Sequence, residues 1–522
     1  MHAERPKIAL VTTSLLDLGI RSLKATLDKN NFQTQLYLLD AMAGRYSRSE
    51  LNQVLVSLEN FAPSVIGIST LEYSLLKTRQ LLQAIRLNNA FKQCLCVAGG
   101  IGATLSPEDY IDLTDAIVIG EGEDVFLELI QKFLNNKEIN GIKNSWVKIN
   151  GIIFKNPLLP ISTDLNCLPI GKNEAGAYRI HNGRLLRLKE GVFTTDYKPW
   201  RKESIFIFES RGCAHNCSFC IYGHNHTGYT KQIRRRGVSQ ILEHLEREKK
   251  SNPSLKLVHL IENDFLSRSQ EEIEEFAQGY KTKIALPYFI YCTPENTTVD
   301  KLSPLVDSGL RSPIMGVQSG SERIKKYIYN RPMDNQMVLK ATEAINKFSH
   351  KIKPMYDFII NNPYEKKEDI LDTINLIHLI PKPFIVSNHC LVFFKGTDLY
   401  KKAWKDKISP KIYYDAEHDY HDARYYLNNE NNLYLNSFML WLERMQIGLH
   451  KMPSLYVRLR PVFISTRTCR FMEKIPVALL LANSGLLLIS RLKEITVKII
   501  RSMRSHCFIG ILNGTFYTYK LG

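Results

Sequence analysis

The order of apolar and polar residues divides most of the chain into short apolar runs and longer amphipathic stretches. In the first 135 residues, the apolar runs lie at 7–15, 34–40, 65–71, 94–100 and 115–122. Amphipathic stretches lie between or after them, at 20–30, 49–61, 75–89 and 123–134. Short apolar strands that alternate with helices are typical of a parallel sheet. This region is therefore predicted to be a doubly wound sheet that binds ligands at the carboxyl ends of its strands.

The same alternation returns in residues 201–406. Its apolar runs lie at 204–210, 255–264, 287–294, 312–320, 354–363 and 384–394. Amphipathic stretches such as 238–250 and 269–280 lie between these runs. Six βα units predict a partial (βα)6 barrel of the TIM type, with its site at the C-terminal ends of the strands.

Two segments depart from this alternation. Residues 136–200 are predicted to be a connector with a β-hairpin that turns at Asn150–Gly151. Residues 407–522 begin polar and tyrosine-rich and become apolar at 475–490, a run of 16 residues. A membrane span needs about 20 apolar residues. We expect a mainly helical region that selects the substrate, and the alternative is peripheral contact with an anionic membrane surface.

Composition indicates a globular protein in a reducing compartment. The 522 residues are 44% hydrophobic, and the ten cysteines are scattered, unlike those of a secreted disulfide framework. The first residues contain no secretory signal, so a cytoplasmic location is expected. A net charge of +17 predicts attraction to an anionic molecule or surface. No nucleic-acid motif accompanies this charge, so no nucleic-acid partner is expected.

Three cysteines, Cys213, Cys217 and Cys220, directly follow the first strand of the second region. Three unrelated thiols are improbable at this spacing. A zinc site would need a fourth ligand, for which His215, His224 and His226 are the nearby candidates. An iron–sulfur cluster held by three thiolates would leave one iron free for a substrate. This last interpretation explains why the loop has three cysteines and not four.

The CxxxCxxC spacing after a first barrel strand resembles the radical S-adenosylmethionine (radical SAM) superfamily. Later strand ends follow in the family's order, from "IENDFLS" and "MGVQSGSERI" to "FFKGTDLYKKA". "YDFIINNPYEKKED" resembles the strand near the adenine but has "INNP" where many members are glycine-rich. The resemblance implies that Cys213, Cys217 and Cys220 hold a [4Fe–4S] cluster. It also implies contacts to S-adenosylmethionine (SAM) from Phe219, Asn263, Asp264, Gln318, Ser319 and Ser321.

The N-terminal region is similar to the flavodoxin-like cobalamin-binding domain that often precedes such a barrel. That domain has the pattern Asp-x-His-x-x-Gly, then Ser-x-Leu, then Gly-Gly. The resemblance assigns cobalamin binding to Asp17, Gly19, Ser69, Leu71, Gly99, Gly100, Gly120, Glu121 and Gly122. Gly19 stands where the histidine ligand would be, so no axial histidine is expected from this loop. The alternative is a flavodoxin-like domain that binds no cofactor.

Together these resemblances imply a cobalamin-dependent radical SAM enzyme, most simply a methyltransferase acting on an unactivated carbon of an unidentified substrate. One SAM would methylate cobalamin, and a second would yield the 5′-deoxyadenosyl radical that abstracts hydrogen. An electron donor such as flavodoxin or ferredoxin is implied. The alternatives are cobalamin-assisted cyclisation or rearrangement without methyl transfer, and a non-catalytic cobalamin sensor. A methylthiotransferase is disfavoured because the N-terminal region has only Cys94 and Cys96 where that family needs three cysteines.

Overall fold

The computed structural model describes residues 5–14, 17–39, 45–71, 74–159, 164–171, 176–188, 204–222, 233–408 and 432–444. The N-terminal part forms a nine-stranded sheet with five parallel strands at its centre, in the order β5-β4-β3-β1-β2. This order is the flavodoxin-like arrangement expected from the sequence. The strands are β1 (Lys7–Thr12), β2 (Gln33–Leu38), β3 (Val65–Ser69), β4 (Leu95–Gly99) and β5 (Ala116–Val118).

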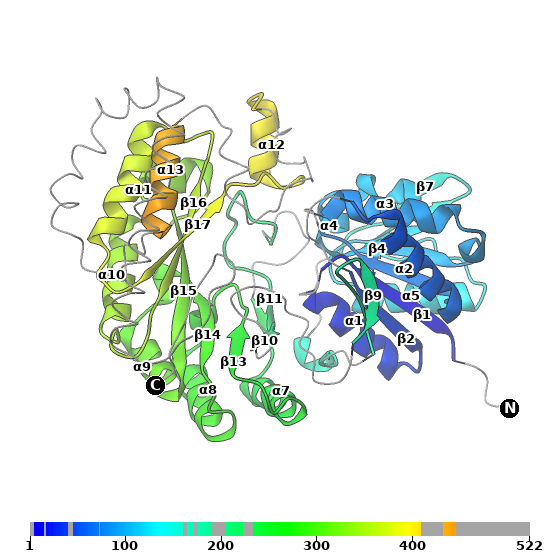
Figure 1. The fold of residues 1–522 in the computed structure, drawn as a ribbon, viewed down its shortest axis with the longest axis horizontal. Coiled ribbons are helices and arrows are strands. Elements are labelled where there is room, and N and C mark those ends of the chain that lie inside the picture. The colour runs from blue at the N-terminus through cyan, green and yellow to red at the C-terminus, as the bar shows by residue number, and fades with distance from the viewer. Residues whose placement is uncertain are drawn as a thin grey trace.

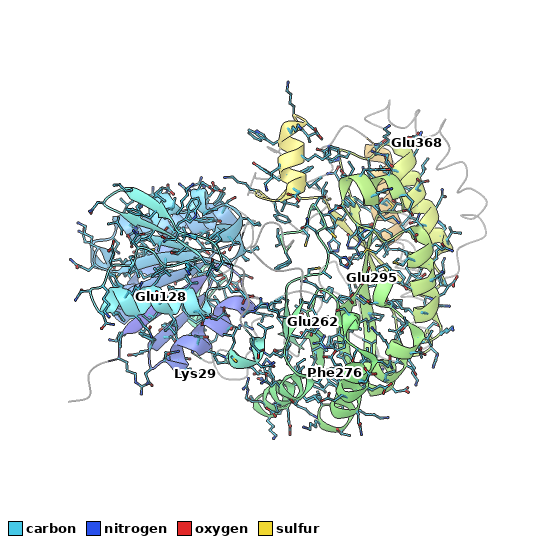
Figure 2. The ribbon with its side chains drawn as sticks, turned by 180° about the vertical axis from the view of Figure 1, so that it is seen from behind. Lys29, Glu128, Glu262, Phe276, Glu295 and Glu368 are labelled. Carbon is cyan, nitrogen blue, oxygen red and sulfur yellow. The ribbon has the colours of Figure 1, made fainter. Side chains whose placement is uncertain are left out.

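Helices cover both faces of this sheet because successive strand residues point to opposite sides. In β1, Ile8 and Leu10 pack with α1 and α5, while Ala9 and Val11 pack with α2 and α3. From behind, Lys29 and Glu128 mark α1 and α5 on one face (Figure 2). The helices are α1 (Leu18–Lys29), α2 (Arg48–Phe61), α3 (Leu75–Leu87), α4 (Gly100–Leu105) and α5 (Glu123–Leu134).

A β-hairpin extends each edge of the sheet. The predicted turn at Asn150–Gly151 is confirmed, with positive φ at both residues, and it joins β6 (Ser145–Ile149) to β7 (Ile152–Lys155). The sequence analysis missed a second hairpin, β8 (Tyr178–His181) and β9 (Arg184–Arg187), which extends the sheet beyond β2. Its turn, Asn182–Gly183, carries the same Asn-Gly signal. The boundaries of the predicted connector remain a prediction.

The second region is an open barrel of six parallel strands in chain order (Figure 1). Among the described residues the first and last strands are not paired, so this is the partial barrel that the sequence predicts. The strands are β10 (Ser204–Ile207), β13 (Leu257–Leu260), β14 (Tyr288–Cys292), β15 (Leu310–Gln318), β16 (Met355–Ile360) and β17 (Ile385–Cys390). A short ribbon, β11 (Ser210–Arg211) with β12 (Arg234–Arg235), follows the first strand.

Alternate strand residues separate the outer face of the barrel from its interior. In β16, Tyr356, Phe358 and Ile360 join one continuous core with the helices outside. Asp357 and Ile359 are absent from that core and point inward. The outer helices are α7 (Val238–Ser251), α8 (Gln270–Lys283), α9 (Val299–Ser308), α10 (Asn335–Asn346) and α11 (Lys367–Leu379).

Two further helices follow the last barrel strand. Helix α12 (Asp398–Lys405) lies near the junction with the N-terminal domain (Figure 1). Helix α13 (Leu433–Arg444) packs beside β17 and α11, and Asn388 Nδ2 donates to the carbonyl of Met439 at 3.0 Å. The apolar run at 475–490 lies outside the described residues. Within the described ranges, every helix is too short or too polar to cross a bilayer.

Candidate active site

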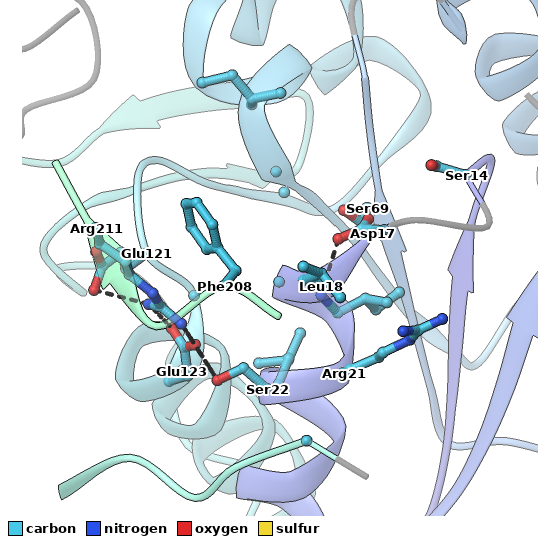
Figure 3. Close-up of a pocket in the computed structure, with 18 of the residues that line it drawn as sticks. Ser14, Asp17, Leu18, Arg21, Ser22, Ser69, Glu121, Glu123, Phe208 and Arg211 are labelled. Carbon is cyan, nitrogen blue, oxygen red and sulfur yellow. Dashed lines mark hydrogen bonds and ion pairs between the residues drawn. The ribbon is translucent and has the colours of Figure 1, made fainter. Parts of the chain in front are cut away.

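A cavity of about 500 Å³ lies between the strand ends of the N-terminal sheet and the first strands of the barrel. Figure 3 shows Asp17 and Ser69 on the N-terminal side of this cavity and Phe208 and Arg211 on the barrel side. All nine residues that sequence motifs assign to cobalamin line it: Asp17, Gly19, Ser69, Leu71, Gly99, Gly100, Gly120, Glu121 and Gly122. The fold thus brings four separate loops together at one surface.

The loop glycines keep this surface open. Gly100 has φ +86°, and a Cβ there would lie 2.8 Å from the carbonyl oxygen of Thr70. Gly120 has φ +83°, and its N–H donates to Thr104 Oγ1 at 2.9 Å. Side chains at these positions would be strained and would fill the space between the loops. The backbone itself therefore forms much of the predicted cobalamin surface.

Asp17 has a structural task at the rim of the cavity. Its Oδ1 accepts from the N–H of Ile20 at 3.0 Å and caps α1, and its Oδ2 accepts from Thr12 Oγ1 at 2.9 Å. Gly19 lies in the first turn of that helix, as the sequence requires. Among the described residues that line the cavity, the one histidine is His244 on α7. Its Nδ1 pairs with Glu209, and its Nε2 lies 3.8 Å from Glu248.

Two carboxylates of the "GEGE" loop bind arginines of the barrel. Glu123 Oε1 accepts from Arg211 at 2.6 Å and from Ser22 Oγ at 2.7 Å. Glu121 lies 3.0 Å from Arg211 and also pairs with Arg234 (Figure 3 shows the Arg211 contacts). The two glutamate side chains are only 7% and 6% exposed. Burial alone would raise the pKa of Glu123, but the charge and hydrogen bonds of Arg211 hold that pKa below its ordinary value.

The cysteine loop is held at the mouth of the barrel by three later segments. Asn263 Nδ2, after β13, donates to the carbonyl of Gly212 at 2.6 Å. The N–H of Ser218 donates to the carbonyl of Tyr329 at 2.9 Å, after a π-helical turn at Ile324–Ile328. The N–H of Leu399, in α12, donates to the carbonyl of Ser218 at 2.8 Å. The "GTDLY" ending singled out from the sequence therefore fixes the loop.

Phe219 anchors the same loop through apolar packing. Its ring lies edge-on to that of Tyr329, with centroids 5.0 Å apart. Both rings belong to a cluster that includes Ile359 from β16 and Leu399 from α12. The aromatic residue before the last cysteine thus joins the loop to the inner face of the barrel.

The thiols lie in a desolvated setting that fits a bound group. Burial raises the pKa of Cys220 to about 12 and also raises the pKa of Cys213. Beside them, Asn216 Oδ1 and Arg331 Nε are buried with no hydrogen-bond partner among the described residues. Buried thiols beside unsatisfied polar atoms suit a cluster that contributes both metal and acceptor sulfur. Within the described ranges, no three His, Cys, Asp or Glu side chains converge as ligands of one metal ion.

The predicted SAM residues divide into two groups. Asn263 lines the cavity, and Gln318 ends β15 with φ +70° on the inner face of the barrel. Asp264 is buried and accepts from Thr293 and Asn296 at 2.6 Å, and its burial raises its pKa. Ser319 and Ser321 are buried within the turn that follows β15, where Ser321 Oγ donates to Asp369 and Ser319 contacts Thr373. Asp264, Ser319 and Ser321 therefore stabilise the ends of the strands through these buried contacts.

A polar group that the sequence analysis did not identify faces the barrel interior. His389 Nε2 lies 3.0 Å from Ser387 Oγ and 3.5 Å from Asp357 Oδ1. The neighbours of these residues, Val386 and Tyr356, point into the outer core, so the three polar side chains point inward. Burial lowers the pKa of His389, but the hydrogen bond and charge of Asp357, together with the charge of Glu443, more than offset this and raise that pKa overall. His389 remains 43% exposed, so it is accessible from the interior.

Comparison with known proteins matches two segments of the chain to protein families. Residues 208–377 match the Radical SAM superfamily profile, and residues 6–130 match the B12 binding domain profile. An uncharacterized methyltransferase of Pyrococcus horikoshii, PH0819, is 22% identical over 65% of this chain and 68% of that protein. Cytidylyl-2-hydroxyethylphosphonate methyltransferase of Streptomyces wedmorensis is 22% identical over 64% of this chain and 66% of that protein. The chain thus spans about two thirds of the length of these relatives.

A third relative and two solved structures extend the comparison. The anaerobic magnesium-protoporphyrin IX monomethyl ester cyclase of Rubrivivax gelatinosus is 25% identical over 36% of this chain and 31% of that protein. The cobalamin-dependent SAM radical enzyme OxsB superposes with a TM-score of 0.65, 13% identity, and 96% and 81% coverage of the two chains. The radical SAM methyltransferase TsrM of Kitasatospora setae gives a TM-score of 0.60, 14% identity and 76% coverage of both chains. At these identities the structures show a shared fold.

Proposed function

We propose, from the premise that this chain belongs to the radical SAM superfamily and carries a B12 binding domain, that it is a cobalamin-dependent radical methyltransferase acting on an unactivated carbon. One observation carries the proposal. The cavity that gathers all nine predicted cobalamin residues is also lined by Gly212, Ile221 and Tyr222, which flank the cysteine loop. The cavity therefore reaches the residues on either side of the cysteine loop, which supports a transfer between groups bound at the two places.

The residues of the two loops would hold the cofactors. Cys213, Cys217 and Cys220 would ligate a [4Fe–4S] cluster, and Asn263 and Gln318 would contact SAM. When bound, the cluster and SAM supply a radical that removes hydrogen from carbon, and cobalamin supplies a methyl group. The glycine loops at the ends of β3, β4 and β5 would hold cobalamin, and Gly19 would supply no side-chain ligand to it. Asp264, Ser319 and Ser321 would keep the SAM-binding strand ends in position.

The polar side chains of Asp357, Ser387 and His389, on the last two barrel strands, would orient the substrate. Ser387 and Asp357 both lie at Nε2 of His389, which leaves Nδ1 of that ring for a polar group of the bound molecule. The electron that reduces the cluster would come from a donor such as flavodoxin or ferredoxin. A cytoplasmic location and a substrate-selecting role of residues 407–522 are parts of the proposal. Peripheral membrane contact through those residues remains the alternative prediction.

Methyl transfer can be tested before the substrate is known. The reconstituted, reduced protein is incubated with cobalamin and methyl-deuterated SAM. A methyltransferase should form deuterated methylcobalamin and S-adenosylhomocysteine, together with 5′-deoxyadenosine from slow uncoupled cleavage. The Cys217→Ala variant is the control, because it should lose 5′-deoxyadenosine formation. When a substrate is found, its product should carry the labelled methyl group.

The similarity to a cyclase gives cobalamin-assisted cyclisation or rearrangement as the second candidate. Formation of 5′-deoxyadenosine without labelled methylcobalamin or S-adenosylhomocysteine would reject methyl transfer and favour this second function. A non-catalytic cobalamin sensor is the third candidate. It would bind cobalamin but take up no iron on anaerobic reconstitution.

A further inference from the structure

We infer that Arg331 is a tuning residue of the cluster, whose guanidinium donates a charge-assisted hydrogen bond to the Cys217 sulfur and favours the reduced state of the cluster. The inference rests on the proposed function because it assumes that the cysteine loop holds a cluster. It adds a residue that no sequence motif singled out. Arg331 is 8% exposed, and its Nη1 lies 3.5 Å from Cys217 Sγ.

The fold holds this side chain in place from several directions. Arg331 Nη2 donates to the carbonyl of Gly316, on the inner face of β15, at 2.6 Å. A Cβ at Gly316 would make an ordinary contact of 3.5 Å with Nη2, but it would lie 2.4 Å from Gln318 Nε2, so the glycine leaves room for Gln318 beside the guanidinium. The backbone N–H of Arg331 donates to the carbonyl of Lys325 at 2.8 Å, across the π-helical turn.

The residues just before Arg331 run along the cysteine loop. Asn330, with φ +49°, donates from Nδ2 to the carbonyl of Asn216 at 2.9 Å. The carbonyl of Tyr329 accepts from the N–H of Ser218 at 2.9 Å. These two bonds lie on either side of Cys217 in the sequence. They fix the distance between the arginine and the sulfur independently of any bound group.

The charge of Arg331 has no carboxylate partner among the described residues. A buried cation without a counter-charge is costly. Three thiolates around an iron–sulfur core give the site net negative charge, and reduction adds one more electron. A fixed positive charge at Cys217 therefore stabilises the reduced cluster more than the oxidised one. Hydrogen bonds to the cluster sulfurs and nearby charges are known determinants of the reduction potential of an iron–sulfur cluster.

The test is a redox titration of the full-length protein with its cluster reconstituted and without SAM, followed by electron paramagnetic resonance. Arg331→Gln keeps a donor but removes the charge, and should shift the reduction equilibrium about tenfold toward the oxidised state, a fall in potential of about 59 mV for one electron. Arg331→Lys keeps the charge and should give a smaller shift. The matched control is Arg323→Gln, because the Arg323 guanidinium contacts Asp369 instead of the loop. It should leave the potential unchanged.

Several results would overturn the inference. One is an unchanged potential in Arg331→Gln that retains four irons. A second is an unchanged potential with weakened SAM binding, which would assign the arginine to the SAM carboxylate. A third is loss of the cluster from both Arg331 variants with the fold intact by circular dichroism, which would make the residue structural. If only one of the two Arg331 variants retains four irons, the reduction potential of that variant decides the test. Failure of the unaltered protein to bind iron would instead refute the proposed function.

Discussion

Replacing Arg211 by methionine tests whether the two domains are held together by the buried ion pairs at the cavity. The substitution keeps an apolar stem of similar length but removes the guanidinium. Arg211 bridges Glu123 and Glu121, at 2.6 Å and 3.0 Å, and its side chain is 15% exposed. After the change, Glu121 keeps Arg234 and Glu123 keeps the hydroxyl of Ser22. Glu123 thus becomes a buried carboxylate without a cation.

The expected loss of stability follows from the contacts that remain in the variant. Breaking a buried ion pair by removing one partner costs about 3–5 kcal/mol. The partial exposure of Arg211 and the remaining Ser22 hydrogen bond place the expected loss near the lower end, at about 3 kcal/mol in the free energy of unfolding. The control is Lys351→Met, because Lys351 pairs with Asp307 at a site where the two side chains are 47% and 57% exposed. That pair should contribute about 0–1 kcal/mol.

The assay is a double-mutant cycle that combines Arg211→Met with Glu123→Gln, followed by denaturant unfolding of the apoprotein. The cycle isolates the Arg211–Glu123 coupling from other effects of each substitution. We expect a coupling of about 1–3 kcal/mol at pH 7. A coupling below about 0.5 kcal/mol, the usual error of additivity, would refute the ion-pair account of domain docking.

The pH dependence of the same variant gives an independent check. In the unaltered protein the pKa of Glu123 is held low, so its contribution is present above the unfolded carboxyl pKa and is lost only as the pH falls through the lower folded value. Without Arg211, burial should raise the pKa of Glu123 instead. As the pH falls, protonation of Glu123 then removes the buried charge and reduces the destabilisation of the variant. The stability difference between the two proteins should therefore be smaller at pH 5 than at pH 7.

The remaining predictions concern the cofactors and the barrel interior. Cys217→Ala should abolish uptake of four irons while Cys96→Ala retains it, measured by iron content after anaerobic reconstitution; equal content would contradict the cluster assignment. Gly100→Ala should weaken cobalamin binding at least tenfold, because a Cβ would meet Thr70 O at 2.8 Å at φ +86°; unchanged affinity by absorbance titration would reject that surface. In nuclear magnetic resonance titrations the pKa of His389 should lie above its ordinary value and fall in Asp357→Asn, and no change would break the inferred pairing.

Much of the fold could be predicted because the six barrel strands and the five strands β1 to β5 of the N-terminal sheet are parallel and largely buried. Such strands are short apolar runs, and each run from 7–15 to 384–394 overlaps one of these eleven strands. The hairpin β8–β9 was missed because its strands are short and partly polar, "YRIH" and "RLLR", and lack a clear period. The Asn182–Gly183 turn was the available signal. Its pairing with β2 depends on a contact far along the chain.

The candidate site could be predicted where each function is carried by a local motif. The cobalamin glycines and the three cysteines follow strands, and the common edge of a parallel sheet brings strand ends together. Arg331 and His389 belong to no such motif, and Asp357 lies in the segment that resembles the strand near the adenine without being singled out there. Their roles depend on which residue lies opposite in the folded chain, such as Cys217 for Arg331, 114 residues earlier. A periodic pattern gives the face on which a side chain lies but not its partner.

The "GEGE" segment shows how one motif can serve two sites. Its glycines line the cavity, while the carboxylates of Glu121 and Glu123 point to Arg211. Arg211 lies two residues before Cys213 in the sequence, so the loop that would bind cobalamin is tied almost directly to the loop that would bind the cluster. Since transfer between two bound groups depends steeply on their placement, these ion pairs should matter more for methyl transfer than for cobalamin affinity alone. Loss of Arg211 should therefore reduce transfer to substrate even at saturating cobalamin, when both loops still hold their cofactors.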